Sequence, residues 1–288
     1  MKEKKIREKN NWKKEMALAP GYIIVGIWVI FTFVLIGWII LASFSTTREI
    51  FDGNIFKFAT GLHPENYVKA WKTQKVSSYF MNSLLYTAVS CTAVIILGAP
   101  AAYVLSRFKF RGNGLIQNLF ATALGIPAIM IIMPLFSLFS QLHMNQSKGL
   151  VIFLYIAVNL PFTIFFLNTF FRNLSVTFEE AAAIDGCSPM KTFWTIMLPL
   201  AQPGIITVSI FNFITIWNEY FISLIFANTA KTRPVAVGLY AMIQSMRYTG
   251  DWGGMFAAVV IVFLPTFLLY IFLSEKIIAG VTGGAIKG

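Results

Sequence analysis

The stretch TFEEAAAIDGCSPMKTFWTIMLPL, residues Thr177–Leu200, is a polar, helix-forming segment in an otherwise hydrophobic chain. Thr177 followed three residues later by Glu180 has the spacing of a capping box, which predicts a helix that starts at Thr177. Three consecutive alanines favour the helix, and Gly186 is placed to end it as the first residue beyond the cap. The Ser-Pro pair at 188–189 is typical of a new N-cap and first helical turn. The stretch therefore predicts a short helix, a tight break and a second helix.

So short a first helix is marginal in water, so packing against another surface must stabilise it. One interpretation is that it docks on the ends of the chain's own helices. The other is that it inserts into a separate soluble partner, which small alanine side chains would allow to approach closely.

The composition of the whole chain is that of an integral membrane protein. Of 288 residues, 57% are hydrophobic and 12% are charged, whereas about a quarter of residues are charged in soluble proteins. The net charge of +11 could suggest a nucleic-acid partner. However, many basic residues crowd the N-terminal tail ahead of an apolar run, as topology determinants do. No nucleic-acid binding is expected.

A membrane-spanning helix needs about 20 mostly apolar residues, and six segments meet this requirement. The first is too long for the apolar part of a cleavable signal peptide, so it should remain as a helix. We expect an all-α integral membrane domain over 20–274, with a basic tail at 1–19 and a C-terminal tail at 275–288. The six expected helices cover residues 20–43, 81–105, 115–141, 150–171, 203–226 and 254–274.

The charge distribution predicts the orientation of these spans. A basic N-terminal tail favours the cytoplasmic side, and six crossings return the C-terminus to that side. The connection 172–202, which contains the opening stretch, is then cytoplasmic as well.

The opening stretch also matches a known motif, E-A-A-x3-G-x9-I-x-L-P, at each of its seven fixed positions. These are Glu180, Ala181, Ala182, Gly186, Ile196, Leu198 and Pro199. This is the EAA motif of ABC-importer permeases, and the chain is identified as resembling their carbohydrate-uptake branch, the maltose-type permeases. One departure is Ser175, where family members usually carry proline before the EAA helix.

The resemblance extends over almost the whole chain, and its C-terminal pattern is similar to the second permease of the usual heterodimer. It is carried by ENYVKAW (65–71), NSLLYTAVS (82–90), AAYVLSRFKFRG (101–112), EEAAAIDG (179–186), WNEY (217–220) and GVTGGAIKG (280–288).

The resemblance implies a fold, a location and a set of partners. The fold would be the six-helix type I ABC importer permease, in a prokaryotic cytoplasmic (inner) membrane, with both termini cytoplasmic. The partners would be a homologous permease, a cytoplasmic ATPase dimer and an extracytoplasmic sugar-binding protein. Segment 177–199 would be the helix-loop-helix that couples to the ATPase. Its coupling residues would be Glu179, Glu180, Ala181, Ala182, Ala183, Asp185 and Gly186.

No catalytic or cofactor chemistry is expected in this chain. It lacks the G-x-x-x-x-G-K-[ST] phosphate-binding motif, so ATP would be bound by a partner subunit. His63 and His143 are solitary in the sequence, which is not the pattern of a metal site. We expect a transporter component, not an enzyme.

A transport path requires polar side chains inside the membrane domain. On the expected fifth helix, Ser209, Asn212, Thr215, Glu219 and Ser223 recur at spacings that place them on one face. Acidic side chains such as Glu219 are rare inside a membrane span and are functional by default. The alternative is that these groups tie helices together. The candidates for the path are Asn82, Tyr86, Tyr155, Asn159, Asn212, Thr215, Trp217, Asn218 and Glu219.

Two other functions stay open at this level. An ion-coupled secondary transporter working alone would need intramembrane ionisable groups, of which Glu219 is the only one in the expected spans. A permease of the same superfamily for a non-sugar solute such as glycerol phosphate would share the EAA segment and differ in the path.

Overall fold

The computed structural model describes residues 12–283, and within this range all regular secondary structure is helical. Two short stretches, η1 and η2, have π-helical hydrogen bonding. The elements are α1 (Trp12–Ser43), α2 (Thr47–Phe51), α3 (Glu65–Val68), η1 (Lys69–Thr73), α4 (Val76–Arg107), α5 (Asn113–Ala123), α6 (Ala128–Gln141), α7 (Lys148–Asn173), α8 (Thr177–Ile184), α9 (Pro189–Thr192), η2 (Phe193–Met197), α10 (Leu198–Leu200), α11 (Gln202–Trp217), α12 (Phe221–Phe226), α13 (Val235–Thr249) and α14 (Trp252–Gly283).

Four helices are long and apolar enough to cross a membrane as single segments: α1, α4, α7 and α14. Two further crossings are possible only if each of two bent helix pairs counts as one span. These pairs are α5 with α6 and the segment α9–α10 with α11. The all-α membrane fold is confirmed, but the expected third and fifth helices are not continuous.

The expected third span, 115–141, is broken between α5 and α6, whose axes are bent by 98°. The reason is local: Pro127 precedes the first residue of α6, and the residue before a proline is pushed out of the helical region. Gly125 and Ile126 instead form turn hydrogen bonds to Thr122 and Ala123.

The expected fifth span, 203–226, ends as α11 at Trp217 and restarts as α12 at Phe221. Glu219 causes the restart, because its carboxylate accepts hydrogen bonds from the backbone N–H groups of Ile222 (2.7 Å) and Ser223 (3.0 Å). The prediction that one continuous helical face carries the polar residues from Ser209 to Ser223 is therefore wrong.

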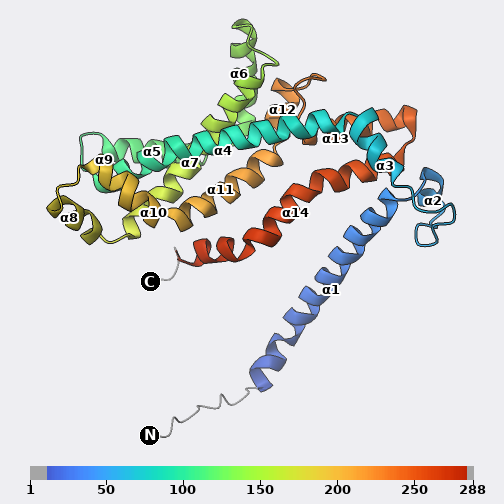
Figure 1. Ribbon diagram of the computed structural model, residues 1–288, viewed down its shortest axis with the longest axis horizontal. Coiled ribbons are helices and arrows are strands. Elements are labelled where there is room, and N and C mark those ends of the chain that lie inside the picture. The colour runs from blue at the N-terminus through green and yellow to red at the C-terminus, as the bar shows by residue number, and fades with distance from the viewer. Residues whose placement is uncertain (1–11, 284–288) are drawn as a thin grey trace.

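The helices form an elongated bundle with two distinct ends (Figure 1). The α8 end contains α8, α9, η2 and α10, and the α13 end contains α2, α3 and α13. Helices α4 and α7 pack along each other, and α11 packs against α4, α7 and α14. At Gly98 of α4 the approach is so close that a Cβ atom would lie 2.9 Å from Thr163 Cγ2 on α7.

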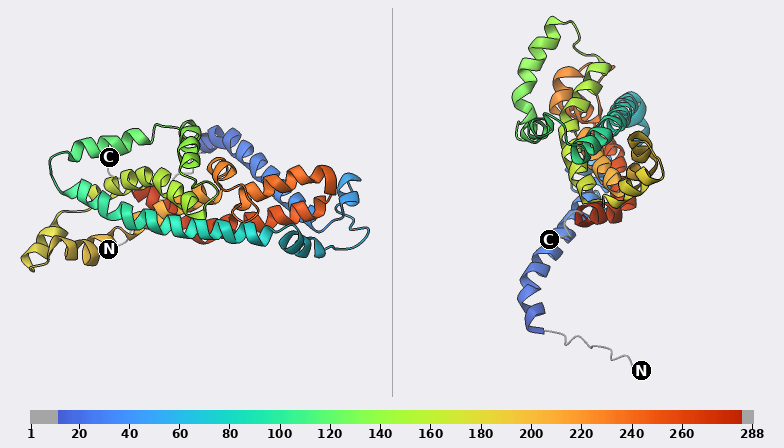
Figure 2. Two further views of the ribbon diagram at one scale, coloured as in Figure 1. Left: turned by 90° about the horizontal axis from the view of Figure 1, so that it is seen from above. Right: turned by 90° about the vertical axis from the view of Figure 1, so that its left-hand side faces the viewer.

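Helix α1 contacts α14 and then diverges from the bundle towards its N-terminal end (Figure 2). Its most hydrophobic window contains no buried residue. At the other terminus α14 is helical to Gly283, and the part of it that is apolar enough to span a membrane ends at Glu275. Residues 1–11 and 284–288 of the two expected tails lie outside the described residues.

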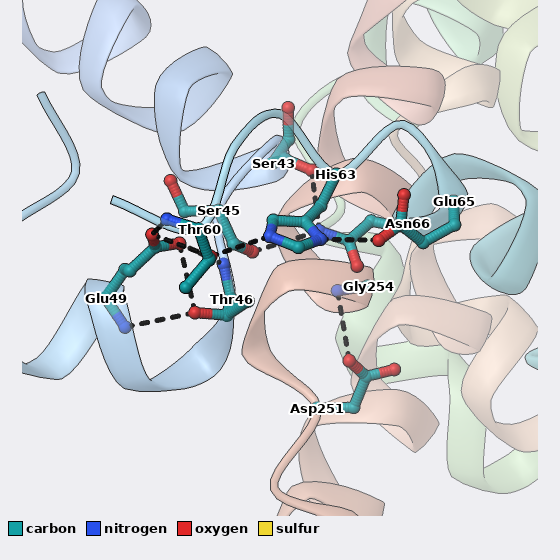
Figure 3. Close-up of polar contacts among 10 residues, drawn as sticks. All are labelled: Ser43, Ser45, Thr46, Glu49, Thr60, His63, Glu65, Asn66, Asp251 and Gly254. Atoms are coloured by element: carbon teal, nitrogen blue, oxygen red, sulfur yellow. Dashed lines mark hydrogen bonds and ion pairs between the residues drawn. The ribbon is translucent and has the colours of Figure 1, made fainter. Parts of the chain in front are cut away.

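A network of polar contacts joins the end of α1, α2 and α3 at the α13 end, next to the α13–α14 turn (Figure 3). Glu49 accepts hydrogen bonds from the backbone N–H groups of Thr46 and Thr60, both at 2.9 Å, and these bonds lower its pKa to about 2. The Asn66 amide donates to the carbonyls of Ser43 and Ser45. The Asn66 bonds therefore hold the C-terminal end of α1 to α3.

Candidate functional site: a docked coupling segment and a polar bundle core

The segment from α8 to α10 has the predicted helix-break-helix form. Gly186 ends the first helix in a left-handed conformation (φ +76°), and the backbone N–H of Cys187 donates to Ala182 O. Ser188 caps α9 by accepting the N–H of Lys191 at 3.4 Å, with Pro189 at the first position. The break and the second helix start are thus confirmed.

The predicted capping box is wrong. Val176, in a helical conformation, is the N-cap of α8, so Thr177 lies inside the first turn. The N–H of Glu180 bonds to Val176 O at 3.1 Å. Ser175 supplies the local polar contact, because its Oγ accepts the N–H of Thr177 at 3.3 Å. Ser175 is the residue that departs from the family's proline, and its hydroxyl takes up a backbone donor there.

The inner face of the segment is docked on the bundle. Ala182 is buried, as are Phe193 and Met197 further along. The Tyr103 ring on α4 lies 5.0 Å from the Phe193 ring and 5.5 Å from the Phe171 ring, centroid to centroid. These aromatic contacts stabilise the short helices, which would not persist alone.

An ion pair completes the docking. Arg107 Nε, in the last turn of α4, lies 3.2 Å from Glu179 Oε2 on α8, and the two side chains are only 10% and 20% exposed. Arg107 Nη2 also donates to the carbonyl of Leu174, at the end of α7, at 2.7 Å. A single guanidinium therefore joins α4, α7 and α8.

The outer face of the segment is exposed and apolar. Ile184 is 87% exposed and Met190 is 68% exposed, with Phe178 and Trp194 also exposed. Of the predicted coupling residues, Ala182 faces the bundle and Glu179 is half-buried. The remaining predicted coupling residues are exposed: Glu180, Ala181, Ala183, Asp185 and Gly186.

The predicted path residues divide into several groups. The first surrounds Glu219, whose carboxylate accepts the Tyr155 hydroxyl at 3.0 Å and the Ser223 hydroxyl at 3.1 Å, besides the two backbone donors of α12. Tyr155 and Ser223 also contact each other through their hydroxyls. This group joins α7 to the break between α11 and α12.

A second group lies deeper between α7 and α11. The Asn159 amide donates to Tyr155 O, Thr163 Oγ1 donates to Asn159 O, and the Asn212 amide donates to Thr163 Oγ1 at 2.9 Å. Asn212 is buried and its Oδ1 has no partner within the described part of the chain.

A third group ties α4 to the loop that precedes α13. The Asn82 amide donates to the carbonyls of Lys231 and Arg233, and the Tyr86 hydroxyl donates to Thr232 O at 2.8 Å. Lys148 donates to Asn82 Oδ1 at 2.7 Å. The side chains of Asn82 and Tyr86 thus hold a connection in place.

The last predicted path residues lie near the end of α11. Trp217 is buried, stacks on Phe213, and donates its indole N–H to Val262 O on α14 at 3.3 Å. Thr215 and Asn218 are exposed. These two side chains lie on a surface that other molecules could reach.

Sequence reasoning missed Arg107 as a site residue and Thr163 as a partner of Asn212. The sequence shows Arg107 as a basic residue just beyond the expected span 81–105. Its pairing with Glu179, however, depends on how α4, α7 and α8 pack. Among residues 12–283, no three acidic, histidine or cysteine side chains come together in a way that could hold a metal ion.

Comparison with known proteins agrees with this architecture. The family model described as "Binding-protein-dependent transport system inner membrane component" matches residues 94–277. The permease protein NgcG of a diacetylchitobiose uptake system in Streptomyces coelicolor is 33% identical over 93% of this chain and 89% of its own length. The trehalose/maltose permease protein MalG of Thermococcus litoralis is 31% identical over 96% of this chain and 98% of its own.

A solved structure shares the fold. The chain aligns with a bacterial ABC transporter involved in the import of the acidic polysaccharide alginate, with a TM-score of 0.77 and 21% identity, over 91% of this chain and 97% of that one. The helical bundle, the docked segment with its EAA motif and the sequence matches lead to one conclusion. The chain belongs to the family of binding-protein-dependent transport system inner membrane components, the permease subunits of ABC importers.

Proposed function

We propose that this chain is the permease subunit of an ATP-driven carbohydrate importer and that the α8 segment docks into a cytoplasmic ATPase. The observation that carries the proposal is the two-sided construction of that segment. Its inner face is buried against Tyr103, while its outer face exposes Ile184 and Met190. An exposed apolar patch at the end of a short docked helix is typical of a protein interface.

The two adjacent acids have different roles in this proposal. Glu179 points towards the bundle and pairs with Arg107, whereas Glu180 is exposed. Because Val176 is the N-cap, Glu180 is not needed to start the helix. Glu180, Ala181, Ala183, Asp185 and Gly186 therefore form the surface offered to the ATPase, and ATP is bound by that partner.

The orientation follows from charge. Arg107, Lys109 and Arg111 cluster at the C-terminal end of α4, at the α8 end, and basic residues accumulate on the cytoplasmic side of membrane proteins. The α8 end is accordingly cytoplasmic, as are both termini, in a prokaryotic inner membrane. The α13 end faces outwards, where an extracytoplasmic sugar-binding protein would deliver the substrate.

Relatives support a sugar as the substrate class. NgcG belongs to a diacetylchitobiose uptake system and MalG to a trehalose/maltose transport system. A homologous permease would supply the other half of the path. In this chain the exposed side chains of Thr215 and Asn218 face the path, and Asn82, Tyr86, Tyr155, Asn159, Asn212, Trp217 and Glu219 support its wall from within.

Thiol crosslinking in membranes tests the coupling role. With Cys91 and Cys187 replaced, a thiol at the exposed position Ile184 should crosslink to the co-expressed ATPase in a nucleotide-dependent manner. A thiol at the buried position Ala182 is the matched control and should not react. If the Ile184 thiol catches no ATPase although the transporter is inserted and active, the segment is internal packing.

Uptake by the reconstituted transporter separates the remaining alternatives. Sugar uptake should persist when the proton gradient is collapsed at constant ATP, which an ion-coupled secondary transporter would not allow. Competition by oligosaccharides but not by glycerol phosphate would identify the solute class. The comparisons with known proteins favour the ABC importer over the secondary transporter.

A further inference from the structure

Helix α4 is anchored by polar side chains at both of its ends. At the α8 end, Arg107 pairs with Glu179. At the α13 end, Asn82 and Tyr86 hold the carbonyls of Lys231, Arg233 and Thr232. The helix between them runs from Val76 to Arg107 without a break, with Pro100 inside it. At a rise of about 1.5 Å per residue, Asn82 and Arg107 stand roughly 38 Å apart along its axis.

At the α13 end, polar side chains of α4 bind backbone groups of the loop 229–234 and of the first residue of α13. Besides the two side chains above, Ser83 Oγ accepts the backbone N–H of Val235 at 2.9 Å, in a buried position. Lys148 donates to Asn82 Oδ1, so the Asn82 amide is held from both sides. Backbone groups bound in this way follow the helix that binds them, because breaking the bonds would leave buried polar groups unsatisfied.

At the α8 end, the Arg107–Glu179 ion pair joins α4 to α8. Arg107 lies at the C-terminus of α4 and Glu179 in the first turn of α8, so each charge also complements the dipole of its own helix. Both side chains are mostly buried, and a charge left without its partner in such a place is costly. A cavity of about 290 Å³, lined by Tyr103, Ala183 and Cys187 among others, lies beside the pair. Aromatic packing alone therefore does not fill the space between α8 and α4.

We propose that the Arg107–Glu179 ion pair is the link through which movement of the α8 segment drives α4, and that α4 carries this movement to the loop 229–234 at the opposite membrane face. Arg107 and Glu179 are positioning residues: they contact neither the solute nor ATP. The inference rests on the proposed function, because it needs an ATPase to move α8.

The first test measures sugar transported per ATP hydrolysed by the complete transporter, with its partner permease and ATPase, in proteoliposomes. Glu179→Gln keeps the side-chain shape and removes the charge, and Arg107→Gln removes the charge with a shorter side chain that also gives up the bond to Leu174 O. Each should lower the ratio about tenfold, within the range typical of coupling between sites, while ATP hydrolysis continues. Lys109→Gln, an exposed basic residue two positions from Arg107, is the control and should keep the wild-type ratio.

The second test is charge exchange. The double variant Arg107→Glu with Glu179→Arg restores the pair but opposes both helix dipoles. It should recover part of the ratio that Arg107→Glu or Glu179→Arg loses alone. A merely structural role would give variants that lose assembly and ATP hydrolysis together with transport.

The third test measures whether the loop 229–234, at the α13 end of α4, responds to nucleotide binding. A fluorophore on Ala230→Cys, an exposed loop position, with Cys91 and Cys187 replaced, should change its emission when nucleotide binds the ATPase. Glu179→Gln should abolish this change. Unaltered transport per ATP and an unaltered loop signal in Glu179→Gln and Arg107→Gln would overturn the inference. If the Ile184 crosslink to the ATPase persists in those variants, the proposed function stands while the inference falls.

Discussion

Loss of the Glu219 carboxylate should destabilise the membrane domain through Tyr155. In Glu219→Ala, the start of α12 loses its cap, which costs about 1 kcal/mol. The Tyr155 hydroxyl, on a ring that is only 1% exposed, keeps its contact with the Ser223 hydroxyl but loses its hydrogen bond to a charged group, which costs about 2 kcal/mol. The expected total is about 3 kcal/mol, or roughly 6 °C in unfolding midpoint for a chain of this size.

A double-mutant cycle of Glu219 and Tyr155 measures the coupling free energy between these two side chains. Tyr155→Phe alone removes one hydrogen bond to a charged group and should cost about 2 kcal/mol. In the Tyr155→Phe background the bond between Tyr155 and Glu219 is already absent, so Glu219→Ala should cost only the cap. The double variant should therefore cost about 3 kcal/mol, not about 5, which is a coupling of about 2 kcal/mol.

Thermal unfolding in lipid nanodiscs, followed by tryptophan fluorescence, measures these shifts, and sugar uptake is measured on the same variants. If the stability losses of Glu219→Ala and Tyr155→Phe add up in the double variant, the Tyr155 hydroxyl and the Glu219 carboxylate act independently and the reasoning fails. If Glu219→Ala unfolds at the wild-type temperature but no longer transports, Glu219 serves the solute and not the fold.

Three other changes test the remaining structure. Gly238→Ala should cost about 1–3 kcal/mol in thermal unfolding, because its Cβ would lie 2.2 Å from Tyr79 Cδ2, whereas Gly21→Ala, with no atom nearby, should be neutral. Gly186→Val should lower transport without preventing membrane insertion, because a β-branched residue is strained at φ +76°; wild-type uptake would contradict it. Glu49, whose pKa is lowered to about 2 by the backbone N–H groups of Thr46 and Thr60, contributes stability that is present above its ordinary pKa of about 4.3. That stability should be lost as pH falls from about 5 to 2, and Glu49→Gln should flatten this part of the stability profile relative to Asp52→Asn, an exposed control.

The long spans were predictable from sequence because a run of apolar residues sets its own length in a bilayer. Helices α1, α4, α7 and α14 appear where such runs lie. The break at Gly186 and the helix start at Ser188 were predictable for a different reason: turn and cap chemistry depends on the residues next to it in the sequence.

The broken spans were not predicted, because a charge-free run does not reveal where a helix bends. The α5–α6 break had a local signal in Pro127 that the count of apolar residues ignored. The α11–α12 break depends on Glu219, whose carboxylate is held by Tyr155 from another helix. Such contacts between distant residues follow from packing and are absent from any sequence window.

The polar residues of the bundle illustrate why an unusual residue in a span does not define a path by itself. Asn82, Tyr86, Asn159 and Glu219 each use their polar atoms on groups of their own chain. A sugar hydroxyl would have to compete with those bonds, and breaking one inside the bundle costs about as much as the new bond returns. We therefore expect direct solute contacts from this subunit to come from exposed groups such as Thr215 and Asn218, although the Asn218 amide also donates to Ile214 O at 2.8 Å. Replacing these two should change solute affinity with little effect on stability, the reverse of the pattern for Glu219.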